Sequence, residues 1–372
     1  MAKRYGKKPP RTRGRQLTRQ IRDHFDGDED DLDDLVETWI EPPPPTKSAP
    51  ASAPADEAGD DAQPEPPGTR DGIVVGLESG LCWVDDDGES ILCVLPSRIA
   101  QNQRASIAVG DEVRYAPHDT ETFRVLSVAP RRSELSRPDP HNPRERRVLA
   151  ANIDIIVHIG SVVVPPVRPA LIDRFLIIAA RGGASLLVWI NKVDLLDTEG
   201  RNELESVLAP YRALDVPILL GSTLDATTIE TLRQRLAGKT AVFAGHSGVG
   251  KSSLLRALAP NLDIAIGAVS TAWGKGRHTT TSSSLYRLAD DTKVIDTPGI
   301  RELGIDVDPA ALDMYFDDIA AFATRCRFRD CRHIDEPGCA VLEAVANGEL
   351  SQARYDAYLR IRASLETAEG SS

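Results

Sequence analysis

The residues most able to do chemistry form one short run, Gly245 to Ser253, with the sequence GHSGVGKSS. It matches the phosphate-binding pattern GxxxxGK[ST], and it lies between an apolar stretch at 240–244 and a helical pattern that starts at Lys251. In such a loop, glycines let backbone N–H groups surround phosphates, Lys251 reaches the β and γ oxygens, and Ser252 ligates Mg²⁺. The predicted phosphate-binding residues are Gly245, His246, Ser247, Gly248, Val249, Gly250, Lys251, Ser252 and Ser253.

The base of the nucleotide is predicted from a second run, NKVD at 191–194, which follows the apolar stretch 185–190. The Asp194 carboxylate can accept from both N1–H and the exocyclic amine of guanine, whereas adenine offers no such pair of donors. Asn191 would brace the loop, and the stem of Lys192 would pack over the ring. The run therefore favours GTP over ATP, with Asn191, Lys192, Val193 and Asp194 as binding residues and Ser222 as a further contributor from the loop after 216–220.

A third run, DTPG at 296–299, follows the apolar stretch 293–295. Its position predicts that Asp296 holds Mg²⁺ through water and that the amide of Gly299 meets the γ-phosphate. The preceding loop at 274–281 is rich in glycine and threonine. We expect Thr280 to complete the Mg²⁺ shell, with Thr279 and Thr281 as alternatives; an ordinary polar loop is the competing interpretation.

The order of these runs is unusual, because the guanine-selecting run precedes the phosphate loop. A Ras-like GTPase presents them in the opposite order, so the pattern indicates a circular permutation. Ras-like enzymes also place a water-orienting Gln directly after DxxG, and here that position is Ile300. One possibility is that His278 orients the water, and His278 and Lys251 are then our two candidate catalytic residues. The other is that a partner completes the site. We therefore expect slow hydrolysis by the protein alone.

A separate set of metal-ligating side chains follows, made of Cys326, Cys331, His333 and Cys339. Three thiolates and one imidazole within fourteen residues suit a closed tetrahedral Zn²⁺ site that folds a short segment. Four protein ligands leave no open position, so the pattern favours structural over catalytic zinc. Arginines lie among the ligands, and they indicate either a nucleic-acid contact or a solvated face.

The elements that must position these residues alternate between apolar strands and helices from about 150 to 308. That alternation predicts a parallel sheet with helices on both faces, which is the α/β class of P-loop GTPases. We expect strands at 153–159, 185–190, 216–220, 240–244 and 293–295. We expect helices at 169–181, 200–214, 226–237 and 251–258. Beyond 309 the sequence reads as helical at 309–324 and from 339 to about 366, with the metal ligands between.

Upstream, residues 71–135 contain five short β-rich runs separated by turn signals. Five strands in so short a segment predict a small barrel, and an oligonucleotide-binding (OB) type is the commonest candidate, although periodicity does not separate it from an SH3-like barrel. Cys82 and Cys93 fall in these runs, and we interpret them as buried apolar residues. The predicted domains are thus an extension at 1–70, the barrel at 71–135, the permuted GTPase domain at 140–308 and a helical zinc domain at 309–372.

The 372-residue chain carries a net charge of -12 that is unevenly distributed. Residues 3–22 hold nine Lys or Arg and no acid, whereas 23–41 hold ten acids and no Lys or Arg. The composition of 1–70 predicts disorder, with a basic arm that either meets phosphates or only solubilises the chain. No apolar run is long enough to span a membrane, so we expect a cytoplasmic protein. A separate expectation is that the chain is a monomer.

Taken together, the runs at 191–194, 245–253, 276–281 and 296–302 and the Cys/His set resemble the ribosome small subunit-dependent GTPase A family of bacteria. The resemblance covers about 71–365 and leaves 1–70 unmatched. It implies a GTPase of late 30S ribosomal subunit maturation that binds 16S ribosomal RNA, is stimulated by the subunit and is released upon hydrolysis to GDP. The alternatives are an RNA-binding scaffold that GTP orders, and a translation factor acting on assembled ribosomes.

Overall fold

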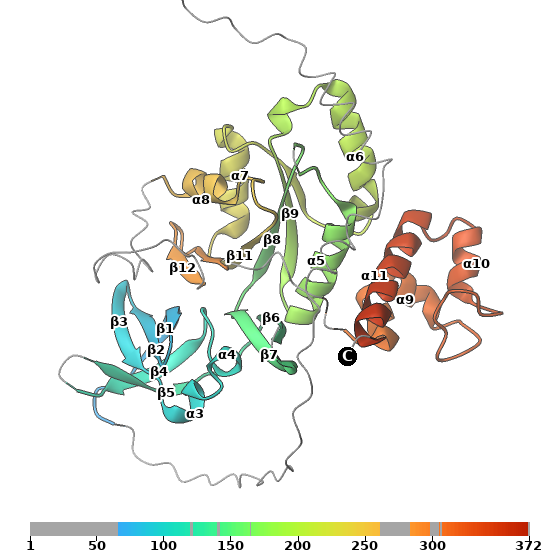
Figure 1. Ribbon diagram of the computed structural model, residues 1–372. Helices are drawn as coiled ribbons and strands as arrows, with labels where there is room; N and C mark the ends of the chain where they lie inside the picture. The colour runs from blue at the N-terminus through green and yellow to red at the C-terminus, as the bar shows by residue number, and fades with distance from the viewer. Residues whose placement is uncertain are drawn as a thin grey trace, which may run out of the picture.

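The computed structural model describes residues 66–119, 122–139, 142–163, 165–260, 283–297, 305 and 307–370. The expectations for the basic arm, the acidic block and the loop at 274–281 fall outside these residues. Figure 1 shows three parts in chain order: a small β-barrel, a central sheet with helices, and a C-terminal group of helices. In the described part of the chain, no helix is long and apolar enough to cross a membrane.

The first part is a closed barrel, as the sequence predicts. Its strands are β1 (Arg70–Glu78), β2 (Leu81–Asp86), β3 (Glu89–Val94), β4 (Glu112–Pro117) and β5 (Phe123–Val128), in the order β1-β2-β3-β5-β4. Two short helices, α3 (Ser97–Ala100) and α4 (Gln103–Ser106), connect β3 to β4. Pairing of β3 with β5 is parallel and closes the five-stranded barrel, whose strand number matches the Greek-key barrel of the OB type. Cys82 and Cys93 are neighbours across β2 and β3 and are fully buried, which confirms their interpretation.

A two-stranded hairpin that the sequence did not reveal follows the barrel. It consists of β6 (Glu134–Asp139) and β7 (Asn142–Ala151), and it covers the stretch where we place the boundary between barrel and GTPase domain. Its strands escape detection because charged residues such as Arg146 and Arg147 interrupt the apolar pattern. The helix after it approaches closely: a Cβ on Gly182 would lie 2.5 Å from the carbonyl oxygen of Glu134.

The central sheet confirms the α/β class. Its strands in spatial order are β10 (Ile218–Leu220), β9 (Ser185–Asn191), β8 (Ile155–Ser161), β11 (Thr240–Ala244), β13 (Lys293–Asp296) and β12 (Ser284–Arg287). All pairs are parallel except β12 with β13, and the antiparallel edge strand β12 was not predicted. β12 is only four residues long, too short for alternation to identify it.

Helices cover both faces of this sheet. On one face lie α5 (Pro169–Gly182) and α6 (Thr198–Arg212), and on the other lie α7 (Ala226–Leu236) and α8 (Lys251–Leu258). Each pair has its own buried apolar cluster against the strands. Because the helices connect parallel strands, the loops that follow the strands gather at one edge of the sheet, where ligands of such folds bind.

The C-terminal part is helical on both sides of the Cys/His set, as expected, but each stretch is divided. The first comprises a 3₁₀ helix, η4 (Pro309–Tyr315), and α9 (Asp317–Ala323); the second comprises α10 (Ala340–Ala346) and α11 (Gln352–Gly370). This group packs on α5 through Arg354, whose guanidinium donates to Asp173 at 2.6 Å and to Asp318 at 2.8 Å. The buried ion pair fixes the helical group against the central domain, because leaving either charge unpaired there would be costly.

Candidate functional site

The phosphate loop turns sharply between β11 and α8. Gly245, Gly248 and Gly250 have positive φ values of 150°, 82° and 104°. A Cβ on Gly245 would lie 2.3 Å from the carbonyl oxygen of Ile159 on the neighbouring strand, so the close approach requires glycine. The Lys251 ammonium donates to the carbonyl oxygens of Gly245 at 2.7 Å and His246 at 2.8 Å. The lysine is thereby folded back onto the loop that precedes it.

Two loops at the ends of β9 and β10 form the side predicted to bind the base. Lys192 adopts a left-handed conformation with φ 64°, and the N–H of Val193 donates to the carbonyl oxygen of Gly221 at 3.2 Å. A Cβ on Gly221 would lie 2.2 Å from the buried ring of Trp189, so this loop passes directly over the indole. Asp194 is exposed, whereas Ser222 is buried with its hydroxyl accepting from the N–H of Leu224 at 3.2 Å.

The structure ties the base-side loop directly to the phosphate loop. The side-chain amide of Asn191 donates to the carbonyl oxygen of Val249 at 2.8 Å, and the Lys192 ammonium donates to that of Gly248 at 3.0 Å. A Cβ on Gly250 would lie 2.3 Å from the Asn191 amide nitrogen. Two runs more than fifty residues apart in the sequence therefore form one site, in which glycine makes room for the asparagine.

Asp296 ends β13 beside the phosphate loop, in register with Phe243 of β11. Burial raises the pKa of Asp296, and the nearby charge of Lys251 opposes that rise. A carboxylate and an ammonium that influence each other at the mouth of a phosphate loop are suited to holding a divalent cation and phosphate oxygens. His278, Thr280 with its alternatives Thr279 and Thr281, and Gly299 lie outside the described residues.

The four predicted metal ligands come together in the C-terminal part, where their ligand atoms all lie within 4.8 Å of one another. Sγ of Cys326 lies 3.8 Å from that of Cys339, and Nδ1 of His333 lies 3.6 Å and 3.4 Å from these two sulfurs. A tetrahedral zinc ion with Zn–S bonds of about 2.3 Å separates two sulfurs by about 3.8 Å. The donor set and its spacing therefore fit a metal ion of this kind.

Sequence reasoning missed the residue that orients the histidine. Nε2 of His333 lies 3.0 Å from a carboxylate oxygen of Asp313 on η4, whose other oxygen accepts from the hydroxyl of Tyr358 at 2.7 Å. The hydroxyl of Tyr355 donates to the carbonyl oxygen of His333 at 2.6 Å. Asp313 precedes the histidine by twenty residues and belongs to no recognisable spacing, so only the fold reveals the contact. The carboxylate directs Nδ1 toward the sulfurs.

A buried histidine outside every predicted set lies next to the phosphate loop. His158 on β8 is paired with Ala244 in the sheet, and its ring stacks on Phe175 with centroids 4.6 Å apart. Its Nδ1 has no hydrogen-bond partner within the described chain. Burial, with a smaller effect from His246, lowers the pKa of His158 to about 3. The imidazole is therefore neutral at physiological pH and serves as part of the core.

We expect replacement His158→Val to reduce the acid sensitivity of the fold. Between pH 6.5, the usual pKa of an unfolded histidine, and the folded value of about 3, the unfolded chain binds the additional proton. The stability that neutral His158 contributes is thus complete above pH 6.5 and is lost as the pH falls toward 3. The loss in the free energy of unfolding is about 2 kcal/mol at pH 5. Thermal unfolding midpoints at pH 5 and 7.5 measure this. The exposed control His118→Val should keep the wild-type pH dependence, and an unchanged dependence in His158→Val would show the assignment to be wrong.

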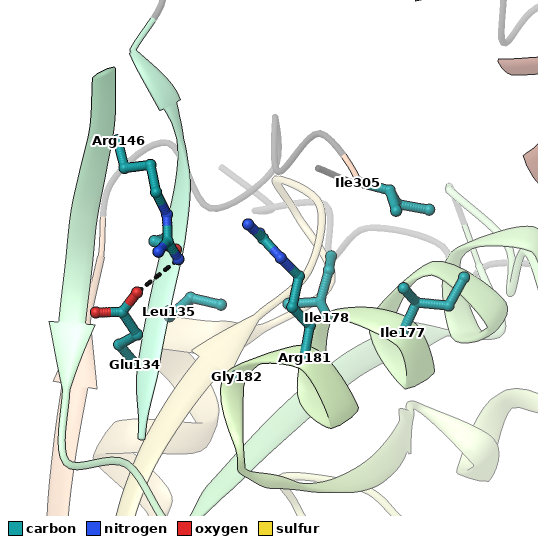
Figure 2. A pocket seen from close by; sticks show the side chains of 9 residues that line it. Glu134, Leu135, Arg146, Ile177, Ile178, Arg181, Gly182 and Ile305 are labelled. Carbon is teal, nitrogen blue, oxygen red and sulfur yellow. Dashed lines mark hydrogen bonds and ion pairs between the residues drawn. The ribbon is translucent and has the colours of Figure 1, made fainter. Parts of the chain in front are cut away.

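A small cavity of about 330 Å³, including its open mouth, lies between the hairpin and α5. Figure 2 shows Glu134 and Arg146 joined on the hairpin side and Arg181 on the helix side, with Ile305 above. The lining comes from elements other than the loops that carry the nucleotide-binding runs. The cavity contains none of the residues predicted from the sequence, so the candidate site remains the edge of the central sheet.

Comparisons with known proteins all point to the same family. A family model described as RsgA GTPase matches residues 128–306. A small ribosomal subunit biogenesis GTPase RsgA from Haemophilus influenzae is 38% identical over 303 residues, covering 80% of this chain and 85% of that protein. A Thermotoga maritima protein of the same name is 37% identical over 295 residues, covering 78% and 95%.

Solved structures show the same similarity. The crystal structure of YjeQ from Thermotoga maritima matches with a TM-score of 0.65 and 35% identity, covering 80% of this chain and 98% of that one. YloQ, described as a circularly permuted GTPase, matches with a TM-score of 0.62 and 29% identity, covering 84% and 99%.

Proposed function

This chain belongs to the RsgA GTPase family, and from that premise we propose that it hydrolyses GTP as a late biogenesis factor of the small ribosomal subunit. The comparisons confirm the family resemblance and the circular permutation inferred from the order of the runs. The proposal includes binding to 16S ribosomal RNA, stimulation by the subunit and release upon hydrolysis to GDP. It also holds that the chain works in the cytoplasm as a monomer. Sedimentation of the full chain checks the monomeric state.

One observation carries the nucleotide part of the proposal: the direct contacts of Asn191 and Lys192 with the phosphate loop. They bring the exposed carboxylate of Asp194 to the same edge of the sheet as Lys251. A ligand with a guanine at one end and a polyphosphate at the other suits both groups. We assign GTP binding to the residues at 191–194 and 245–253, to Ser222 and to Gly299.

The residues that we assign to catalysis are those that could hold Mg²⁺ or orient the attacking water beside the negatively charged phosphates. Mg²⁺ bound with GTP would neutralise charge that develops between the β and γ phosphates. Ser252 is exposed at the start of α8, and Asp296 lies near Lys251, which supports our assignment of both as ligands of the ion. We assign Thr280 as the third ligand. Ile300 replaces the usual water-orienting Gln, and we assign that role to His278, with slow turnover in the absence of a partner.

For the metal centre we propose structural Zn²⁺ held by Cys326, Cys331, His333 and Cys339. The sulfur spacing supports this assignment. The contact of His333 with Asp313 also supports it, because the second ring nitrogen of a metal-bound histidine almost always has a partner such as a carboxylate. Zinc would supply cross-links to a loop with little core of its own. Four protein ligands occupy the tetrahedron, so we give the ion no part in hydrolysis.

We expect Asp313→Asn to weaken Zn²⁺ binding by about 10- to 100-fold, because a contact that orients a ligand histidine typically contributes that much. The asparagine cannot match the carboxylate as an acceptor for Nε2 of His333. Competition between the full chain and a zinc chelator measures the affinity. Asp317→Asn is the matched control, since Asp317 is exposed on the neighbouring helix α9. Equal zinc affinity in both variants would contradict the role given to Asp313.

The RNA part of the proposal is supported by the surface around the metal ligands. Arg325, Arg327 and Arg329 are exposed there, beside an exposed Phe328 on which Arg327 stacks with 5.4 Å between guanidinium carbon and ring centroid. Positive charge beside an accessible aromatic ring suits phosphates and unpaired bases. The OB-type barrel offers a second surface of a class that binds oligonucleotides.

GTP turnover by the full chain, alone and with purified 30S subunits, 50S subunits or 70S ribosomes, tests the proposal, with ATP as the control nucleotide. We expect slow basal turnover of GTP and strong stimulation by 30S subunits alone. Stimulation by 70S ribosomes instead would favour a translation factor. Nucleotide-dependent RNA binding without turnover would favour a scaffold that GTP orders. Absence of stimulation by any particle would contradict the assignment of the partner.

A further inference from the structure

The barrel rests directly on the strand pair that leads into the nucleotide site. Val75 and Val109 of the barrel belong to the same buried cluster as Leu285 of β12 and Ile295 of β13. A Cβ on Gly110 would lie 3.2 Å from the Ile295 side chain, so the contact is close. Figure 1 shows β1 beside β12. The same Cβ position lies closer still to the carbonyl oxygen of Ala151, at 2.2 Å, so movement of the barrel would act on β7 as well as on this pair of strands.

The same two strands adjoin the segments assigned to Mg²⁺ and phosphate. β12 begins four residues after Thr280, and β13 ends at Asp296. In the antiparallel register Ser284 lies opposite Asp296, and Arg287 lies opposite Lys293. A shift of β12 along β13 would change the position of the backbone at Asp296.

An ion pair between Arg287 on β12 and Asp85 on β2 joins the sheet to the barrel. The Asp85 side chain on β2 is 2% exposed, and that of Arg287 is 34% exposed. Nε of Arg287 donates to Oδ2 of Asp85 at 2.5 Å, and Nη2 contacts the same oxygen. The other oxygen of Asp85 accepts from the N–H of Gly88 at 2.9 Å, within the turn between β2 and β3. A carboxylate buried to this extent is costly to leave unpaired, so the contact is tightly maintained.

We propose that Asp85 and Arg287 form a positioning pair, through which an RNA partner bound to the barrel promotes GTP hydrolysis. The pair fixes β12 to the barrel, so a partner that moves or rigidifies the barrel also sets the strands beside Asp296. This inference rests on the proposed function, because it assumes stimulation by the subunit. Basal turnover depends on contacts elsewhere, such as Asn191 with Val249, and does not require the pair.

The test compares Asp85→Asn, Arg287→Gln and the double variant as full chains. The asparagine retains an oxygen that can accept from Gly88, so the hairpin turn is preserved. The matched control is Asp71→Asn on β1, whose partner Arg114 lies 3.4 Å away with both side chains well exposed. Turnover is measured with and without 30S subunits, and subunit binding is measured with a non-hydrolysable GTP analogue.

We expect each single variant to lose about tenfold in the stimulated rate, and the double variant to lose no more than either single one. Basal turnover, subunit binding and the control should stay near wild-type values. Full stimulation of the variants would overturn the inference. An equal loss of basal and stimulated turnover would also overturn it, because the pair would then be a general structural clamp.

Two further outcomes separate this inference from the proposed function. A wild-type chain that 30S subunits do not stimulate would contradict the proposed partner, and the inference would fall with it. A stimulated wild type with unaffected variants would contradict the positioning pair alone. If a variant unfolds, Arg287→Lys retains the charge but loses the planar fork, and we expect its stimulation to lie between those of wild type and Arg287→Gln. Wild-type stimulation in both single variants, Arg287→Lys and Asp85→Asn, would overturn the inference.

Discussion

Lys251→Ala is expected to lower GTP turnover by about 10²- to 10³-fold, the loss typical when one preorganised charge is removed from a transition state. Its ammonium lies over the phosphate loop, held by the carbonyl oxygens of Gly245 and His246. The loss has a second cause, because Lys251 opposes the rise that burial produces in the pKa of Asp296. Without the lysine, the burial that raises the pKa of Asp296 is unopposed by this charge.

Single-turnover and steady-state assays of the full chain measure the loss. Lys239→Ala is the matched control: Lys239 is an exposed lysine directly before β11, at the opposite end of the strand that leads into the loop. We expect that control to retain wild-type turnover. Turnover of Lys251→Ala within about tenfold of wild type would contradict the role of the lysine, since a loss that small is below the usual effect of such a group.

Asp194→Asn is expected to weaken GTP binding by about 10²- to 10³-fold and to shift preference toward xanthosine triphosphate. Guanine presents two N–H donors to the carboxylate, and each charged hydrogen bond contributes about 1.5 to 3 kcal/mol. In the asparagine one acceptor becomes an N–H donor that opposes the guanine amine. Xanthine carries a carbonyl oxygen at that position and accepts from the asparagine instead.

Equilibrium titration with GTP, ATP and xanthosine triphosphate measures the shift. Asp215→Asn provides a control at an exposed aspartate with φ 55°, a conformation that asparagine also adopts readily. We expect that variant to bind GTP as wild type does. Weakened binding of all three nucleotides by Asp194→Asn would indicate a disturbed loop. Unchanged GTP binding would show that the base lies elsewhere.

Among the elements, those with an uninterrupted apolar pattern were the most predictable. The strand at 240–244 and the helix at 251–258 have the predicted limits, since an uninterrupted apolar run followed by glycines leaves few alternatives. β12 and the hairpin of β6 and β7 were missed. The first is too short and the second too charged to show a periodic pattern, and both owe their formation to the strands beside them.

The sequence by itself was enough to predict the phosphate loop, a guanine-selecting run, their permuted order and a metal ligand set. Each is a local run in which residue type and spacing carry the chemistry. The tertiary structure alone decided that Asn191 meets Val249, that Asp313 orients His333 and that Asp85 holds Arg287. These partners lie 58, 20 and 202 residues apart. Such contacts follow from which buried polar groups find one another when the chain packs, and no local pattern encodes that choice.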